Sequence, residues 1–253
     1  MQINEHNNEK ARIKGDIVNL SESNPITLKE KICTFCQKYK HGLLLLYLFL
    51  YLPWFSWLEQ TVTNHFHVIH MPIDDKIPFI EYFIIPYLLW FAYVAVAVLY
   101  FLLKNKDEFY RLCAFLFIGM TIFLIISTVY PNGHHLRPVV FERDNIFTDM
   151  VKGLYLADTP TNLFPSIHVY NSIGVNIAVW HCTDFKENKW LRYGSAVFMI
   201  SIVLSTMFLK QHSVFDVITG IVLSVFMYTV VYTRDTLHAG EGKTALKEQV
   251  RQI

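Results

Sequence analysis

The chain has 253 residues, of which 53% are hydrophobic and 17% are charged. A charged fraction this low is unusual for a soluble domain of this size and indicates a chain surrounded by lipid. The 22 lysines and arginines nearly balance the 21 aspartates and glutamates. This balance argues against a nucleic-acid partner, which would require a strong basic excess.

The N-terminal segment is polar and has neither the apolar core nor the cleavage site of a secretory signal. Within it, Thr27–Glu30 is a capping box, and apolar residues follow at helical spacing with lysines between them. This pattern predicts an amphipathic helix on the membrane surface, with a poorly ordered tail as the alternative. Cys33 and Cys36 have no second ligand cluster, so we interpret them as reduced thiols rather than as a zinc site.

Long apolar segments follow and predict an all-α fold, a bundle of six transmembrane helices. The fourth segment is the weakest because it contains His168, Asn171, Ser172 and Asn176. Polar residues within a span usually face the interior of a bundle, so we expect this face to line a site. The six predicted spans lie near 42–58, 79–103, 112–130, 167–182, 193–210 and 215–232.

Basic residues are unevenly distributed between the segments that connect the spans. They gather before the first span and after the second, fourth and sixth, whereas the first loop on the other side has Lys76 alone among acidic residues. This bias predicts that both termini lie in the cytosol. The chain is expected to be an integral protein of the plasma membrane. The loop 131–166 and the turn around Gln211 are then outside. The expected organisation is a cytosolic tail (1–41), a six-span domain (42–232) and a second cytosolic tail (233–253).

The long outer loop also contains a predicted helix. Asp144 can cap it, Asp158-Thr159-Pro160 can end it, and one apolar stripe runs along it. We expect this helix on the outer surface or across the mouth of the bundle. The stripe consists of Ile146, Phe147, Met150, Val151 and Leu154.

Three short polar segments fall at the predicted outer ends of spans. They are residues 130–138, 164–168 and 205–216, and together they place histidines, cations and a carboxylate at one depth. His212 and Asp216 are four residues apart, so an early start of the last helix would put them on one face. A carboxylate bonded to one ring nitrogen fixes the tautomer and directs the other nitrogen as a nucleophile or base.

The remaining polar residues of these segments suit a phosphate ester. Ser166 is a good N-cap, and the amides of the helix turn that it begins favour an anion. His168 in that turn can act as an acid toward a leaving oxygen. Arg137 carries a planar fork that matches phosphate oxygens. The set predicts phosphoryl transfer without a metal or another cofactor.

These segments resemble the type 2 phosphatidic acid phosphatase and vanadium haloperoxidase superfamily. Its motifs are Lys-x6-Arg-Pro, Pro-Ser-x-His and Ser-Arg-x5-His-x3-Asp. Residues 165–168 match the second motif fully. Ser205, His212 and Asp216 match the third, with Thr206 in place of arginine, and Arg137-Pro138 match the end of the first, with Tyr130 in place of lysine.

The resemblance implies a role for each matching residue. His212 would form a phosphohistidine, Asp216 would orient it, and His168 would protonate the leaving group. Arg137 and Ser166 would bind phosphate oxygens. Lys210, one turn beyond Thr206, is expected to replace part of the missing positive charge, with His134 and His135 as further candidates.

Simpler interpretations stay open for several of these residues. His168 and His212 could be polar contacts within the bundle, and Arg137 and Lys210 could extend toward the headgroups. His65, His67 and His70 suggest a metal site, but no acid or cysteine completes the ligand set, so no metal is predicted.

The predicted function is that of a membrane lipid phosphatase acting on a lipid phosphate or lipid pyrophosphate at the outer face. One alternative is a lipid phosphotransferase, because the looser third motif also resembles inositol phosphorylceramide and sphingomyelin synthases. The other is a non-catalytic lipid-binding protein on the same scaffold. No oligomeric state is predicted.

Overall fold

The computed structural model describes residues 28–63 and 65–233. Most of the first predicted tail and nearly all of the last, with its basic residues, lie outside the described residues. The chain divides into two units, Met1–Lys40 and His41–Ile253. In the first unit, α2 (Leu28–Lys38) is the helix predicted after the capping box, and Cys33 and Cys36 are exposed on it.

The second unit is a helical bundle. Five of its helical segments are long and apolar enough to cross a membrane, in the part of the chain that the structure describes. They agree with five of the predicted spans, although α5 begins at Lys106, six residues earlier than expected. They are Lys40–Thr61 (η1, Lys40–Tyr47, with α3, Leu48–Thr61), Glu81–Lys104 (η3, Glu81–Phe83, with α4, Ile84–Lys104), α5 (Lys106–Val129), α8 (Lys189–Phe208) and α9 (Val214–Tyr232).

The predicted fourth span corresponds to α7 (Ile167–His181). This helix is too short to count as a span, so the predicted number of six transmembrane helices is not confirmed. Its 15 residues extend about 22 Å, which is less than the roughly 30 Å of a hydrocarbon core. The chain before α7 is a loop, and most of residues 161–166 are buried. Irregular backbone of this kind is tolerated within a membrane where protein covers it.

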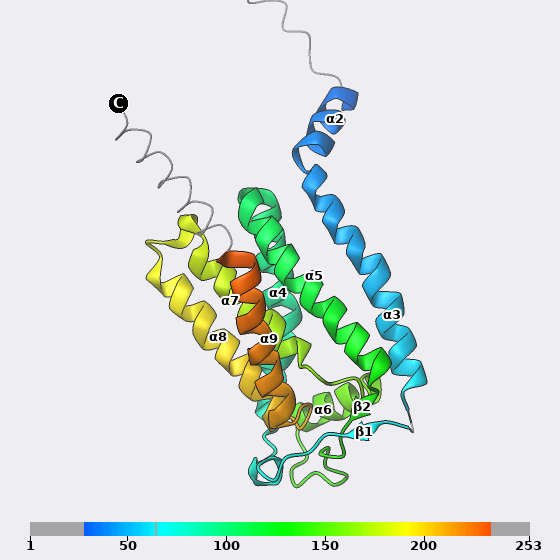
Figure 1. The fold of residues 1–253 in the computed structure, drawn as a ribbon. Coiled ribbons are helices and arrows are strands. Elements are labelled where there is room, and N and C mark those ends of the chain that lie inside the picture. Colours follow the sequence, from blue (N-terminus) through cyan, green and yellow to red (C-terminus); the bar gives the residue numbers. More distant parts are fainter. Residues whose placement is uncertain (1–27, 64, 234–253) are drawn as a thin grey trace, which may run out of the picture. The chain divides into compact units, whose positions relative to one another are not determined.

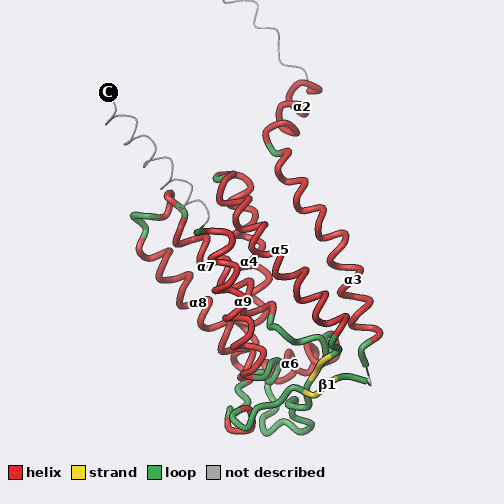
Figure 2. The backbone as a smooth tube through the Cα atoms, viewed as in Figure 1, coloured by secondary structure: helices red, strands yellow, loops and turns green. Residues whose placement is uncertain are grey.

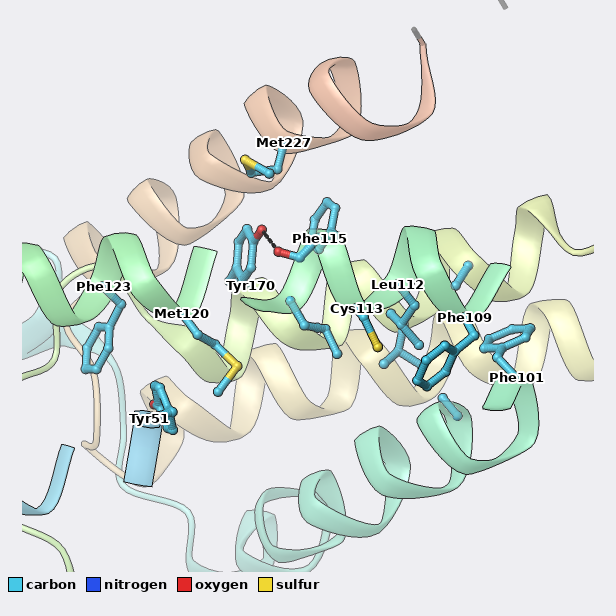
Figure 3. Packing of buried hydrophobic residues seen from close by; sticks show 14 of the residues in the cluster. Tyr51, Phe101, Phe109, Leu112, Cys113, Phe115, Met120, Phe123, Tyr170 and Met227 are labelled. Carbon is cyan, nitrogen blue, oxygen red and sulfur yellow. Dashed lines mark hydrogen bonds between the residues drawn. The ribbon is translucent and has the colours of Figure 1, made fainter. Parts of the chain in front are cut away.

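Helix α7 lies at the centre of the bundle, in contact with α4, α5, α8 and α9 (Figure 1). Figure 3 shows how it is fixed to α5: Tyr170 stacks on Phe115 with ring centroids 4.7 Å apart, and its hydroxyl donates to the Phe115 carbonyl at 2.6 Å. Gly119 leaves room for this ring, because a Cβ there would lie 2.1 Å from it. The close packing sets the position of His168, half a turn before Tyr170.

The helix predicted within the 131–166 loop is α6 (Ile146–Ala157), and it packs against η3 and α4. The predicted cap is wrong: the side chain of Asn145, not Asp144, accepts from the amides of Phe147 and Thr148. Asp144 is one residue too early and is exposed, 3.5 Å from Lys152.

A two-stranded parallel sheet at this end of the bundle was not predicted. It pairs β1 (His67–Val68) with β2 (Asn132–Gly133), shown in yellow in Figure 2. The buried side chain of Asn132 accepts from the amides of Leu163 and Phe164. The sheet therefore ties the first loop to the segment that leads into α7. The remaining short elements are η2 (Asp74–Lys76) and η4 (Thr183–Phe185).

Candidate functional site

The three polar segments meet at one end of the bundle. Residues 130–138 follow α5, and residues 164–168 lead into the first turn of α7. Residues 205–216 include the end of α8, the turn 209–213 and the start of α9. Figure 1 shows these helix ends on the side of the bundle where α6 and the two strands lie.

His212 lies in the turn before α9, and Asp216 lies in the first turn of that helix. Their Nδ1 and Oδ2 atoms are 3.4 Å apart, and both side chains are buried. They do not share a helix face, because α9 begins at Val214 and the early helix start that a shared face requires does not occur. The capping box holds the pair instead: Ser213 caps α9, and its amide donates to Asp216 Oδ2 at 3.0 Å. His212 Nε2 has no hydrogen-bond partner among the described residues.

His168 is held by aromatic rings. It stacks on Tyr87 at 4.7 Å and contacts Trp90 at 4.3 Å, centroid to centroid. Its ring is 5.7 Å from that of His212 at an angle of 61°. Within the described chain no group bonds to the buried Nδ1. The two histidines are thus neighbours with different supports, a carboxylate for His212 and two aromatic rings for His168.

Ser166 precedes α7 and contacts the first turn of α9. Its hydroxyl oxygen caps α7 by accepting from the Val169 amide at 3.4 Å, and its own amide donates to the Asp216 carbonyl at 3.2 Å. The side chain is fully buried. The capping bond leaves the hydroxyl proton free, and the first amides of α7 lack helical partners. This helix terminus can therefore accommodate an anion.

Arg137 is enclosed by protein oxygens rather than by headgroups. Its terminal nitrogens donate to the carbonyls of Tyr155, Asp158 and Thr159 and to the side chain of Gln211. Burial lowers the pKa of this guanidinium, although the Asp158 carboxylate 3.7 Å away opposes the shift. Its Nε is buried without a partner in the described structure.

Lys210 is not where its spacing from Thr206 predicted. Helix α8 ends at Phe208, and Lys210 has a φ of 52°, so the two residues do not share a helix face. Its ammonium donates to the carbonyl of Asp74 at 2.7 Å. Partial burial lowers the pKa of Lys210, and the Asp74 and Asp75 carboxylates counteract this.

Asp74, one of the acidic residues of the first loop, contacts the same turn. Its side chain is 2% exposed and accepts from the Ser213 hydroxyl at 2.6 Å and from the Val214 amide at 2.8 Å. A carboxylate at this point meets the positive end of α9. The first loop thereby holds the turn that carries His212. An acidic residue at the predicted outer surface gives no sign of such a partner in the sequence.

His134 supports the same turn from another side. Its Nε2 is 2.9 Å from the Gln211 carbonyl, and the Leu136 amide donates to its Nδ1. Burial lowers the pKa of His134 to about 4, so the ring is neutral and is not a replacement cation. His135 is exposed beside Phe66. Asp158 has its pKa raised to about 6 by burial, partly offset by Arg137.

The three histidines of the first loop do not form a metal cluster. His67 stacks on Tyr130 at 4.2 Å, and His70 pairs with Asp75 at 2.9 Å. Across the described ranges, no group of three His, Cys, Asp or Glu side chains could hold a metal ion.

Residues 142–236 match the model of the PAP2 superfamily. This confirms the resemblance at the level of the superfamily. The matched segment contains the second and third motifs and excludes Arg137 of the first. No curated protein and no solved structure matches the chain.

Proposed function

Because residues 142–236 form a PAP2 superfamily segment, for which phosphatase or phosphotransferase activity is expected, we propose that the protein hydrolyses a lipid phosphate or lipid pyrophosphate through a phosphohistidine. The observation that carries this proposal is the pair of neighbouring imidazoles, whose ring centroids are 5.7 Å apart, with Asp216 at Nδ1 of His212. A merely structural histidine pair would not need a free Nε2 on the ring that the carboxylate orients.

In the proposed reaction, His212 Nε2 attacks phosphorus while Asp216 holds the proton on Nδ1. The bond between phosphorus and the ester oxygen breaks, and that oxygen takes a proton from His168. His168, now neutral, removes a proton from water as the water attacks the phosphohistidine. Phosphate leaves, and both histidines return to their starting protonation states.

The phosphoryl oxygens need fixed donors as negative charge develops on them. The first-turn amides of α7 and the Ser166 hydroxyl supply some, and the buried Arg137 supplies positive charge. Lys210 is not included, because its ammonium is bonded to Asp74.

A lipid substrate is supported by a cavity of about 510 Å³ between α4, α7 and α8. Its lining is almost wholly apolar and includes Val175 and Val179. These residues follow His168 by seven and eleven positions, so they lie on its face of α7, about 10 and 16 Å along the helix. A chain whose phosphate meets His168 can therefore extend into the cavity.

The site is proposed to face the outside of the plasma membrane. The basic residues of the 104–111 and 186–192 segments lie at the opposite ends of α4, α5, α7 and α8 from the histidines. Basic residues remain preferentially on the cytosolic side, which supports an outward orientation for the histidines.

The decisive experiment uses purified protein in detergent with EDTA, an alkyl lipid phosphate and an aryl phosphate with an acidic phenol. His212→Ala should abolish turnover and the phosphoenzyme. His168→Ala should retain more activity on the aryl phosphate, whose leaving group needs no proton. Asp216→Asn should lose on the order of 10²–10⁴ in rate. Intact cells should hydrolyse the impermeant aryl phosphate if the site faces outward.

Other results would support a different function. Formation of a new phospholipid without free phosphate would identify the phosphotransferase alternative. Loss of activity with EDTA and recovery with one divalent ion would indicate metal-assisted hydrolysis. If His212→Ala and His168→Ala both match the unmodified protein, the site does not transfer phosphoryl groups and the non-catalytic interpretation holds.

A further inference from the structure

Neither residue that stands in place of a family cation brings a hydrogen-bond donor to the histidines. The Thr206 hydroxyl donates to the Val203 carbonyl at 2.7 Å, within its own helix. Tyr130 is 44% exposed and stacks on His67. A phosphate at this site would therefore lack two of the charges that balance it in the family motif, and the surrounding residues must compensate.

Gln211, immediately before His212, is fixed in an unusual way. Its side-chain oxygen accepts from Arg137, its carbonyl accepts from His134, and its amide donates to the Thr206 carbonyl. The residue is 1% exposed, yet its side-chain Nε2 has no partner within the described chain. Arg137 can only donate hydrogen bonds, so the side-chain atom of Gln211 that faces it must be the oxygen. The side-chain nitrogen of Gln211 then points away from Arg137.

A buried donor of this kind is costly to leave unpaired, because it has lost its hydrogen bonds to water. Native proteins keep few such groups, and each one requires an explanation such as a bound water, an ion or a ligand. Two more buried nitrogens without partners lie nearby: Nε of Arg137, the residue bonded to Gln211, and Nε1 of Trp90, whose ring contacts His168. The three donors thus belong to a residue that precedes His212, to a residue bonded to it and to a residue that contacts His168.

We propose that the Gln211 side-chain amide donates to a non-bridging phosphoryl oxygen of the substrate, together with Arg137 Nε and Trp90 Nε1. This inference rests on the proposed function. Hydrogen bonding to Arg137 polarises the Gln211 amide and holds it in place before substrate binds. Preorganised neutral donors stabilise transition-state charge without reorganisation, so they can replace part of the lost cationic charge.

Gln211→Glu separates phosphate binding from a structural role. The carboxylate still accepts from Arg137 but repels an anion where the amide donated. The measured quantities are kcat/KM, inhibition by orthovanadate as a phosphate mimic, and Tm. We expect a loss of 10²–10³ in kcat/KM and a similarly weakened vanadate inhibition, with Tm retained. Trp90→Phe should weaken vanadate inhibition less, because it removes one donor and keeps the ring.

Gln60→Glu is the matched control, because Gln60 is exposed on α3 and bonds to Ser56. It should leave all three quantities unchanged. If Gln211→Glu does not fold, Gln211→Met removes the donor without adding charge. Vanadate inhibition that is unchanged in the folded Gln211 variant, while His212→Ala is inactive, would overturn this inference alone. An active His212→Ala would instead overturn the proposed function.

Discussion

The two halves of α7 have different surroundings. Its first turn meets the turn 209–213, which is held by separate segments through Asp74, His134, Arg137 and Tyr155. Its last turns face the apolar cavity, where Val175 and Val179 lie. Chemistry requires fixed polar groups, whereas a lipid chain requires only volume and apolar contact. The comparison predicts that changes in the two regions will fail in different ways.

Of the changes that separate these two regions, release of the turn that carries His212 should have the largest effect. Asp74→Ala removes the acceptor of the Ser213 hydroxyl and of the Val214 and Met71 amides. Charged hydrogen bonds contribute about 1.5–3 kcal/mol each, and a displacement of 1 Å at a reacting group can cost 10²-fold in rate. We expect kcat to fall by about that factor while the bundle remains folded.

Asp75→Ala provides the control for this change. The exposed Asp75 pairs with His70 and touches neither Ser213 nor Val214. Steady-state kinetics with the aryl and lipid substrates should show equal losses for Asp74→Ala, because the catalytic turn serves both. A selective loss of the lipid substrate would contradict the assigned role of Asp74.

A smaller and more selective effect should come from filling the cavity. Gly194 of α8 lines it, and a Cβ there would meet no atom within 4 Å. Gly194→Leu should therefore fold and should raise KM for a long-chain lipid phosphate by about tenfold, the loss of roughly two buried methylenes. Turnover of the aryl phosphate should not change.

Gly153→Leu on α6 is the matched substitution, because Gly153 also has open space around it but lies outside the cavity. It should alter neither substrate. Equal KM values for the lipid in the Gly194 variant and the unmodified protein would show that the chain does not bind there.

Much of the helical bundle could be predicted from the sequence, because a long apolar segment and a capping residue at its start determine a helix locally. The helix bounds of α7 and α9 lie within one residue of the predicted ones. Contacts that join distant segments could not be predicted, since no local pattern specifies them. Asp74 and Gln211 are such cases: each looks like an ordinary surface residue until the first loop and the Arg137 loop fold against the α8–α9 turn.

Lys210 shows the opposite error, a local pattern that predicted an arrangement the fold does not form. Its spacing from Thr206 is helical, but the turn begins first, and the lysine adopts a left-handed conformation that directs it to Asp74. Spacing predicts shared faces only while the helix continues. A helix end set by tertiary contacts, such as the Tyr155 hydroxyl on the Leu209 carbonyl, gives little signal in sequence.

A last predicted effect concerns stability in acid rather than turnover, and it tests whether His134 supports the catalytic turn as a neutral ring. With a pKa of about 4 in the folded protein and about 6.5 unfolded, His134 binds more protons when unfolded between these values. The free energy of unfolding should therefore fall as pH drops from 6.5 to 4, by up to about 3 kcal/mol. Asp158 acts in the opposite direction, since its raised pKa of about 6 keeps a proton that the unfolded chain releases.

Thermal unfolding from pH 4 to 8 should thus show a shallower acid decline for His134→Gln than for the unmodified protein, with His135→Gln, at an exposed ring, as control. Parallel curves for His134→Gln and His135→Gln would mean that His134 titrates normally and does not hold the turn.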